Sequence, residues 1–179
     1  ISLCRLILNT TSETFVKNIM SSLKNRFDVI LEEKEKMPLV LETLYYIYQK
    51  YIKLFDIDTT KIIVIFMINW MESVTKDLEQ QDILQLRLSF PLFSSSMYYS
   101  IAFLIAVYKT HIVNGKVKDF VDLYIDNSDK LVKFLKVLLR ISEQIDTFPE
   151  KLMNLVATQT LILSCLRRKG SSPKNAIQN

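Results

Sequence analysis

The chain has 179 residues, of which 49% are hydrophobic and 23% are charged, a composition that fits one globular domain and excludes a disordered chain. Only two glycines and four prolines occur, too few for the tight turns of a β-sandwich or an α/β fold. We therefore expect helices. Because the chain begins at Ile1 and not at methionine, we interpret it as a fragment of a longer protein.

The net charge of +4 lies in the C-terminal residues 167–179. They hold four of the 23 basic residues and no acid, so residues 1–166 carry 19 basic residues against 19 acidic ones. A neutral body is a poor match for a phosphate backbone, and we expect no direct contact with nucleic acid. The sequence predicts one domain over residues 1–166, followed by a basic, disordered tail at 167–179.

The first two predicted helices span residues 12–33 and 38–55. Ser12 is the expected N-cap of the first helix, and Pro38 suits the first turn of the second, where its missing N–H costs no hydrogen bond. Apolar residues recur every three or four positions, the period of one helix face. In the first helix they are Phe15, Ile19, Leu23, Phe27, Ile30 and Leu31, and in the second Leu41, Leu44, Tyr45, Tyr48, Tyr51, Ile52 and Phe55.

The third predicted helix, residues 61–78, begins with seven apolar residues in a row, Ile62 to Ile68. A helix without a polar face is surrounded by other elements, so we expect the centre of the core here. The run is rich in β-branched residues, which makes a strand the competing assignment. Its continuation through Trp70 and Glu72 without a turn signal favours the helix.

A short helix is predicted at residues 80–88, and Pro91 is expected to open a long apolar helix that ends near Gly115. Residues 88–108 carry no charge and are long enough to span a bilayer. However, the stretch contains a proline near its start and five serines, which favours a buried core helix. We therefore do not expect membrane association.

Three further helices are predicted at residues 117–125, 128–145 and 149–166. Residues 127–129 supply capping groups for the middle one, and Pro149 opens the last. The middle helix carries a basic stripe of Lys130, Lys133, Lys136 and Arg140. The sequence thus predicts an all-α fold, a single globular bundle of seven to eight helices without a regular repeat.

Residue constellations for catalysis or metal binding are missing from the sequence. His111 is the sole histidine, Cys4 and Cys165 lie far apart, and no glycine-rich phosphate loop occurs. We expect His111 to be a satisfied structural histidine and both cysteines to be buried, reduced thiols. The sequence therefore predicts no enzyme, no metal site and no cofactor.

The aromatic residues indicate more about function than the ionisable residues do, because several tyrosines occur in the predicted helices at residues 38–55 and 91–113. Packing at the edge of the core is the ordinary explanation. The functional interpretation is an apolar pocket between the helices at 62–71 and 91–113, with a few polar anchors. The candidate ligand-binding residues are Asn69, Trp70, Tyr98, Tyr99 and His111.

The stretch FPLFSSSMYYSIAFL at residues 90–104 resembles the proline-led, small-residue-rich apolar helix in the regulatory region of fungal zinc-cluster transcription factors. The helix at 129–145, the proline that follows it and the final helix through Leu166 are similar to the way those regions finish, so the resemblance covers about residues 60–166. The six-cysteine DNA-binding cluster and an acidic activation segment are absent, and no binding residue can be carried over.

The resemblance implies a nuclear, ligand-responsive regulatory domain that binds a small apolar or metabolite effector, or a corepressor protein, and controls an activation region. The alternative function is a non-catalytic helical scaffold within a larger assembly, and the alternative location is the cytoplasm. A scaffold predicts an exposed apolar patch and self-association of the isolated domain.

Overall fold

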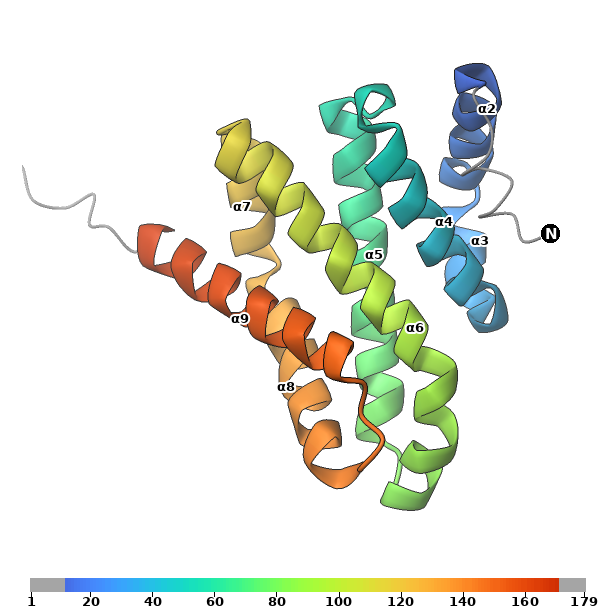
Figure 1. Ribbon diagram of the computed structural model, residues 1–179, viewed down its shortest axis with the longest axis vertical. Helices are drawn as coiled ribbons and strands as arrows, with labels where there is room; N and C mark the ends of the chain where they lie inside the picture. The colour runs from blue at the N-terminus through green and yellow to red at the C-terminus, as the bar shows by residue number, and fades with distance from the viewer. Residues whose placement is uncertain (1–11, 171–179) are drawn as a thin grey trace, which may run out of the picture.

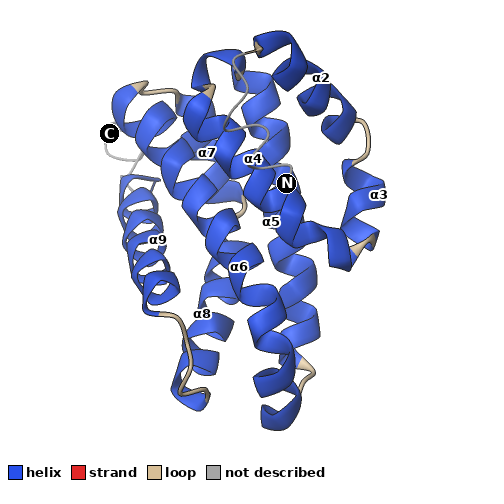
Figure 2. Cartoon of the chain, turned by 45° about the vertical axis from the view of Figure 1, so that its right-hand side comes forward, coloured by secondary structure: helices blue, strands red, loops and turns tan. Residues whose placement is uncertain are grey.

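The computed structural model describes residues 12–170, which form eight α-helices in one bundle and no strand (Figures 1 and 2). The expected all-α fold is confirmed. The helices are α2 (Glu13–Lys24), α3 (Phe27–Glu32), α4 (Met37–Lys50), α5 (Ile57–Glu79), α6 (Ile83–Val107), α7 (Lys118–Asp126), α8 (Ser128–Gln144) and α9 (Glu150–Gly170). Two short 3-10 segments, η1 (Lys34–Lys36) and η2 (Ile52–Leu54), and a π-helical segment, η3 (Tyr108–Asn114), join them.

The two longest helices, α5 and α6, form the middle of the bundle, and the others pack around them (Figure 1). α4 and α9 pack against α6, while α8 packs against both α5 and α9. α2 lies at the edge of the molecule, and its backbone approaches the other helices only sparsely (Figure 1). Two buried residues, Val16 and Met20, hold it to the rest of the core.

The run of apolar residues at 62–68 is helical within α5, so the competing strand assignment is wrong. Asp56 caps the helix by accepting a hydrogen bond from the Thr59 amide at 2.6 Å. Most of the run is buried, but Ile62 and Ile65 are 42% and 43% exposed. The expectation that this helix is enclosed on all sides is therefore wrong on the side of these two residues.

The region expected as one helix at 12–33 is two helices, because the chain turns tightly at Asn25 and Arg26 between α2 and α3. Ser12 caps α2 as expected, through its side chain and the Phe15 amide. The buried face of α2 lies one residue further along than expected. Val16 is buried and Phe15 is 37% exposed, because α2 meets the bundle along its Val16 side.

Pro91 lies inside α6, so the expectation of two separate helices around it is wrong. The helix begins at Ile83, where Asp82 and Gln85 form a capping box with reciprocal hydrogen bonds of 2.8 and 3.3 Å. This cap starts the helix early enough to carry it through the proline. The helical stretch Ile83–Asn114 is the one in the described part of the chain that is long and apolar enough to cross a membrane, and half of its most apolar window is buried.

The C-terminal helix α9 continues to Gly170, whereas its end was expected at Leu166 and residues 167–170 were assigned to a disordered tail. Arg167 explains the extension, because its guanidinium lies 2.6 Å from Asp129 Oδ1 and 3.1 Å from Ser128 Oγ. These contacts tie the last turns of α9 to the start of α8. The remainder of the predicted tail, residues 171–179, lies outside the described residues.

The basic stripe of α8 joins this helix to α5. Lys130 pairs with Glu72 at 2.7 Å and Lys133 with Glu79 at 2.8 Å. The Arg140 guanidinium donates to the carbonyl oxygen of Leu78 at 3.4 Å. Three of the four residues of the stripe therefore connect α8 to α5.

Cys165 is exposed on α9, so its expected burial is wrong. It falls on the outward face of the helix, between the buried Leu163 and Leu166. Cys4 lies outside the described residues.

Candidate effector-binding site

The five candidate ligand-binding residues do not form one site. Asn69 is exposed on α5, whereas its neighbour Trp70 is only 4% exposed and belongs to the core. Tyr98 and Tyr99 are half-buried on α6, with ring centroids 5.3 Å apart. His111 lies one segment later, in η3, among a different set of aromatic rings.

Tyr98 and Tyr99 belong to an aromatic cluster with Tyr45 and Tyr46 of α4. Tyr99 donates a hydrogen bond to Glu42 Oε1 at 3.2 Å. Burial and the neighbouring Tyr46 and Glu42 side chains raise the pKa of Tyr99 well above its usual value. These tyrosines pack the contact between α4 and α6 and are half-buried, as expected for residues at the edge of a core.

His111 stacks on Phe120, with ring centroids 4.5 Å apart, and approaches Tyr48 at 6.4 Å. Its Nε2 and the Tyr48 hydroxyl are buried and lack a hydrogen-bond partner among the described residues. Thr110 is the polar side chain that faces the Tyr48 phenol, but the contact falls short of hydrogen-bond geometry. The expectation of a satisfied histidine is therefore wrong, and burial lowers the pKa of His111.

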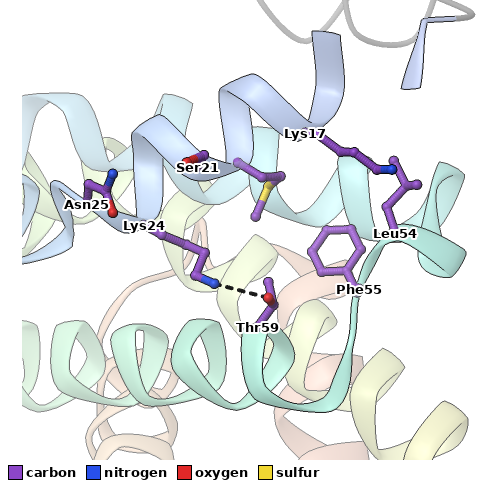
Figure 3. Close-up of a pocket in the computed structure, with 8 residues that line it drawn as sticks. Lys17, Ser21, Lys24, Asn25, Leu54, Phe55 and Thr59 are labelled. Carbon is purple, nitrogen blue, oxygen red and sulfur yellow. Dashed lines mark hydrogen bonds between the residues drawn. The ribbon is translucent and has the colours of Figure 1, made fainter. Parts of the chain in front are cut away.

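A hollow between α2 and the start of α5 is the better candidate for a binding site (Figure 3). We call it the α2–α5 pocket. Its cavity volume is about 220 Å³. Typical drug-sized sites hold roughly 300–1,000 Å³, so this pocket suits a small molecule or one end of a longer one. Its lining residues are Lys17, Met20, Ser21, Lys24, Asn25, Leu54, Phe55 and Thr59.

The lining combines an apolar wall with polar groups. Met20, Leu54 and Phe55 supply the apolar side chains, and Phe55 stands between the two lysines in Figure 3. Lys24 crosses the pocket and donates a hydrogen bond from Nζ to Thr59 Oγ1 at 3.0 Å (Figure 3). An amphipathic ligand fits such a lining, because its apolar part replaces water at the wall while its polar part meets the rim.

The electrostatics of the pocket favour a negative charge. Two lysines, Lys17 and Lys24, belong to the lining and no carboxylate does. Two acids, Asp56 and Asp58, adjoin lining residues in the sequence. Asp56 caps α5, and its pKa is lowered by its hydrogen bonds to Thr59 and by the charge of Lys24, so its carboxylate offsets part of the positive charge. Lys17 and Lys24 are seven residues apart on one helix, so they lie on the same face about 10 Å apart along the axis.

Only part of the signal for this pocket is visible in the sequence. Lys17, Ser21 and Lys24 recur every three or four residues, which on a surface helix indicates a solvated polar face. The local sequence does not indicate which later residues lie opposite that face. In the structure they are Leu54, Phe55 and Thr59, about thirty or more positions further along the chain. The pocket is a product of tertiary packing and could not be found from periodicity.

Comparison of the chain with protein-family models, characterised proteins and solved structures finds no match. In residues 12–170 no group of three or more histidine, cysteine, aspartate or glutamate side chains is placed to hold a metal ion.

Proposed function

We propose that this chain is a non-catalytic, ligand-responsive regulatory domain whose effector is a small amphipathic anion bound in the α2–α5 pocket. The observation that carries the proposal is the lining of that pocket, in which two lysines and an apolar wall meet without a carboxylate. The site lies at the start of α5, whereas the expected pocket lay around Trp70 in the second half of that helix, but the class of function is the one that the sequence predicts.

The chemistry of the lining specifies how the effector lies. Its anionic group accepts hydrogen bonds from Lys17 or Lys24 and from the Thr59 hydroxyl, which is already within reach of Lys24. Its apolar part packs on Met20 and Phe55. A carboxylate or phosphate with a short alkyl or aromatic tail satisfies both requirements.

The position of the pocket supports a regulatory role. One wall is α2, which has sparse backbone contacts with the bundle, and the other is the capped start of α5 in its middle. An effector that bridges the two walls stabilises the docked position of α2 over an undocked one, by the difference in its affinity for the two states. The effector therefore acts by shifting the equilibrium between the docked and undocked positions of α2.

The wider context is proposed from the resemblance of residues 90–104 to fungal zinc-cluster transcription factors. In such a protein the domain acts in the nucleus, and the state of α2 controls the accessibility of an activation region or of a corepressor surface. DNA contact belongs to another part of the protein. The effector domain itself needs no metal, cofactor or catalytic residue for this role.

A thermal-shift screen of the purified chain tests the proposal. We expect saturable stabilisation of a few degrees by short-chain or aromatic carboxylates and phosphates. Ser21→Phe fills the pocket and should abolish the shift, whereas Ser22→Phe, an exposed neighbour on α2 outside the lining, should retain it. A flat screen, or equal loss of the shift in both variants, would contradict the proposal.

A further inference from the structure

Helix α9 buries a glutamine in the middle of its apolar face. Gln159 is 1% exposed, and its Oε1 and Nε2 atoms are buried without a hydrogen-bond partner among the described residues. Its neighbours on this face follow at intervals of three or four positions, which is one side of a helix. They are Leu152, Val156, Leu163 and Leu166, all of them buried. One polar residue therefore interrupts a row of otherwise apolar contacts.

An unpaired amide in an apolar contact opposes the docked position of its helix. In water the Gln159 amide makes hydrogen bonds, which it loses on burial and which no side chain in the contact replaces. A leucine at this position would bury more apolar surface without that loss. The docking of α9 is therefore weaker than the rest of its apolar face allows.

The outer face of the same helix has the reverse arrangement. Leu161 is 68% exposed, although it follows Gln159 by only two positions. The docked orientation of α9 thus buries a polar side chain and leaves a large apolar one in water. Burial of apolar surface is the main force that holds a helix to a bundle, so neither residue stabilises this orientation.

The position of α9 allows it to leave the bundle without the other helices. It lies on the outside of the bundle, where it packs against α6, α7 and α8 (Figures 1 and 2). Residues 145–149 join it to α8, and no helix follows it in the part of the chain that the structure describes. Near its C-terminal end Arg167 pairs with Asp129, but the Asp129 side chain is 98% exposed. Ion pairs at the surface stabilise a fold only weakly.

We infer that α9 is a detachable helix, and that the buried Gln159 amide keeps its docked and released states close enough in free energy for reversible release. In the released state water hydrates the amide, and the faces of α6, α7 and α8 beneath α9 become accessible. This conformational device is separate from the docking of α2, because no residue of α9 lines the α2–α5 pocket.

Hydrogen exchange of the full chain, resolved by helix, tests the inference. Amides in the middle of α9, at residues 156–163, should exchange about tenfold faster or more than amides at residues 134–141 of α8, because α9 opens without global unfolding. Gln159→Leu should slow the exchange of α9 by roughly tenfold or more, since it removes the unpaired amide. Asn154→Leu is the matched control, because Asn154 carries the same amide group on the exposed side of α9. It should change the rate by less than about threefold, the effect of helix propensity alone.

Two outcomes would overturn the inference. In the first, α9 and α8 of the wild type exchange at the same rate, so that α9 opens only when the whole domain unfolds. This comparison needs no variant and therefore decides the matter even where a substitution disturbs folding. In the second, Gln159→Leu slows the exchange of α9 no more than Asn154→Leu does, which would mean that burial of the amide does not oppose docking. Neither outcome depends on effector binding, so the detachable helix and the effector site are tested separately.

Discussion

Lys24 of α2 donates a hydrogen bond to the hydroxyl of Thr59 in the first turn of α5, with Nζ and Oγ1 3.0 Å apart and 35 positions between the two residues. This contact ties the edge helix to the middle of the bundle and lies within the α2–α5 pocket. The same lysine therefore both holds α2 in place and offers a positive charge to the proposed effector.

Removal of this hydrogen bond should destabilise the fold modestly. We expect Lys24→Met to lower the free energy of unfolding by about 1 kcal/mol, the usual net value for one hydrogen bond, in urea denaturation. Thr59→Val should cost a similar amount. The double variant should cost less than the two single variants together, since both remove one contact. Full additivity would show that the two residues do not interact.

Burial of His111 makes the stability of the fold depend on pH. The folded-state pKa of His111 is lowered, so the unfolded chain binds the proton more readily. The stabilising contribution is present above the unfolded pKa of about 6.5 and is lost as pH falls below it toward the folded pKa. Denaturation midpoints of the wild type should fall between pH 7.5 and 5.5. Because His111 is the sole histidine, His111→Gln should flatten this slope, and an unchanged slope would contradict the account.

Just after the π-helical segment, a non-glycine residue adopts a backbone conformation that favours glycine, and substitution can relieve this strain. Lys116 has a φ of 53°, in the left-handed region that costs a non-glycine residue roughly 1 kcal/mol. Lys116→Gly should therefore raise the free energy of unfolding by about 0.5–1 kcal/mol. The neighbouring Gly115→Ala should lower it by about 1 kcal/mol or more, because the new Cβ would lie 3.0 Å from the carbonyl oxygen of His111. Thermal unfolding of both variants checks the opposite signs.

Pro91 interrupts the hydrogen bonding of α6 without ending the helix. A proline in a helix interior costs about 3 kcal/mol, part of which the surrounding packing absorbs. Pro91→Ala should raise the free energy of unfolding by about 1–3 kcal/mol and leave the helical content unchanged. Thermal or urea unfolding checks the prediction, and a destabilised variant would contradict it.

The course of the fold could be predicted where local signals and burial agree. Ser12, Pro38 and Pro149 lie at helix starts as expected, because capping and the missing proline N–H act within one turn. The signal failed at Pro91, where the capping box at Asp82 starts a helix that outlasts the proline. It failed again at Arg167, whose contact with Asp129 lies 38 positions away.

The surface of α6 was harder to predict than its helical structure, because burial on this helix follows no polar face. Leu86 and Leu88 are both leucines two positions apart, yet one is in the core and the other is 72% exposed. Sequence periodicity cannot separate these two leucines. Likewise, Trp70 looked like a pocket residue because of its type, whereas the fold buries it among apolar neighbours.

Isothermal titration with octanoate and its neutral counterpart octanamide tests the central claim most directly. We expect octanoate to bind with a dissociation constant on the order of 0.1 mM and octanamide to bind about tenfold more weakly. Lys17→Met should remove most of that difference, while Lys151→Met, an exposed lysine on α9, should leave it intact. Equal binding of the two ligands would place an effector in the pocket but contradict an anion, and no binding of either, together with a flat carboxylate and phosphate screen, would contradict the effector site itself.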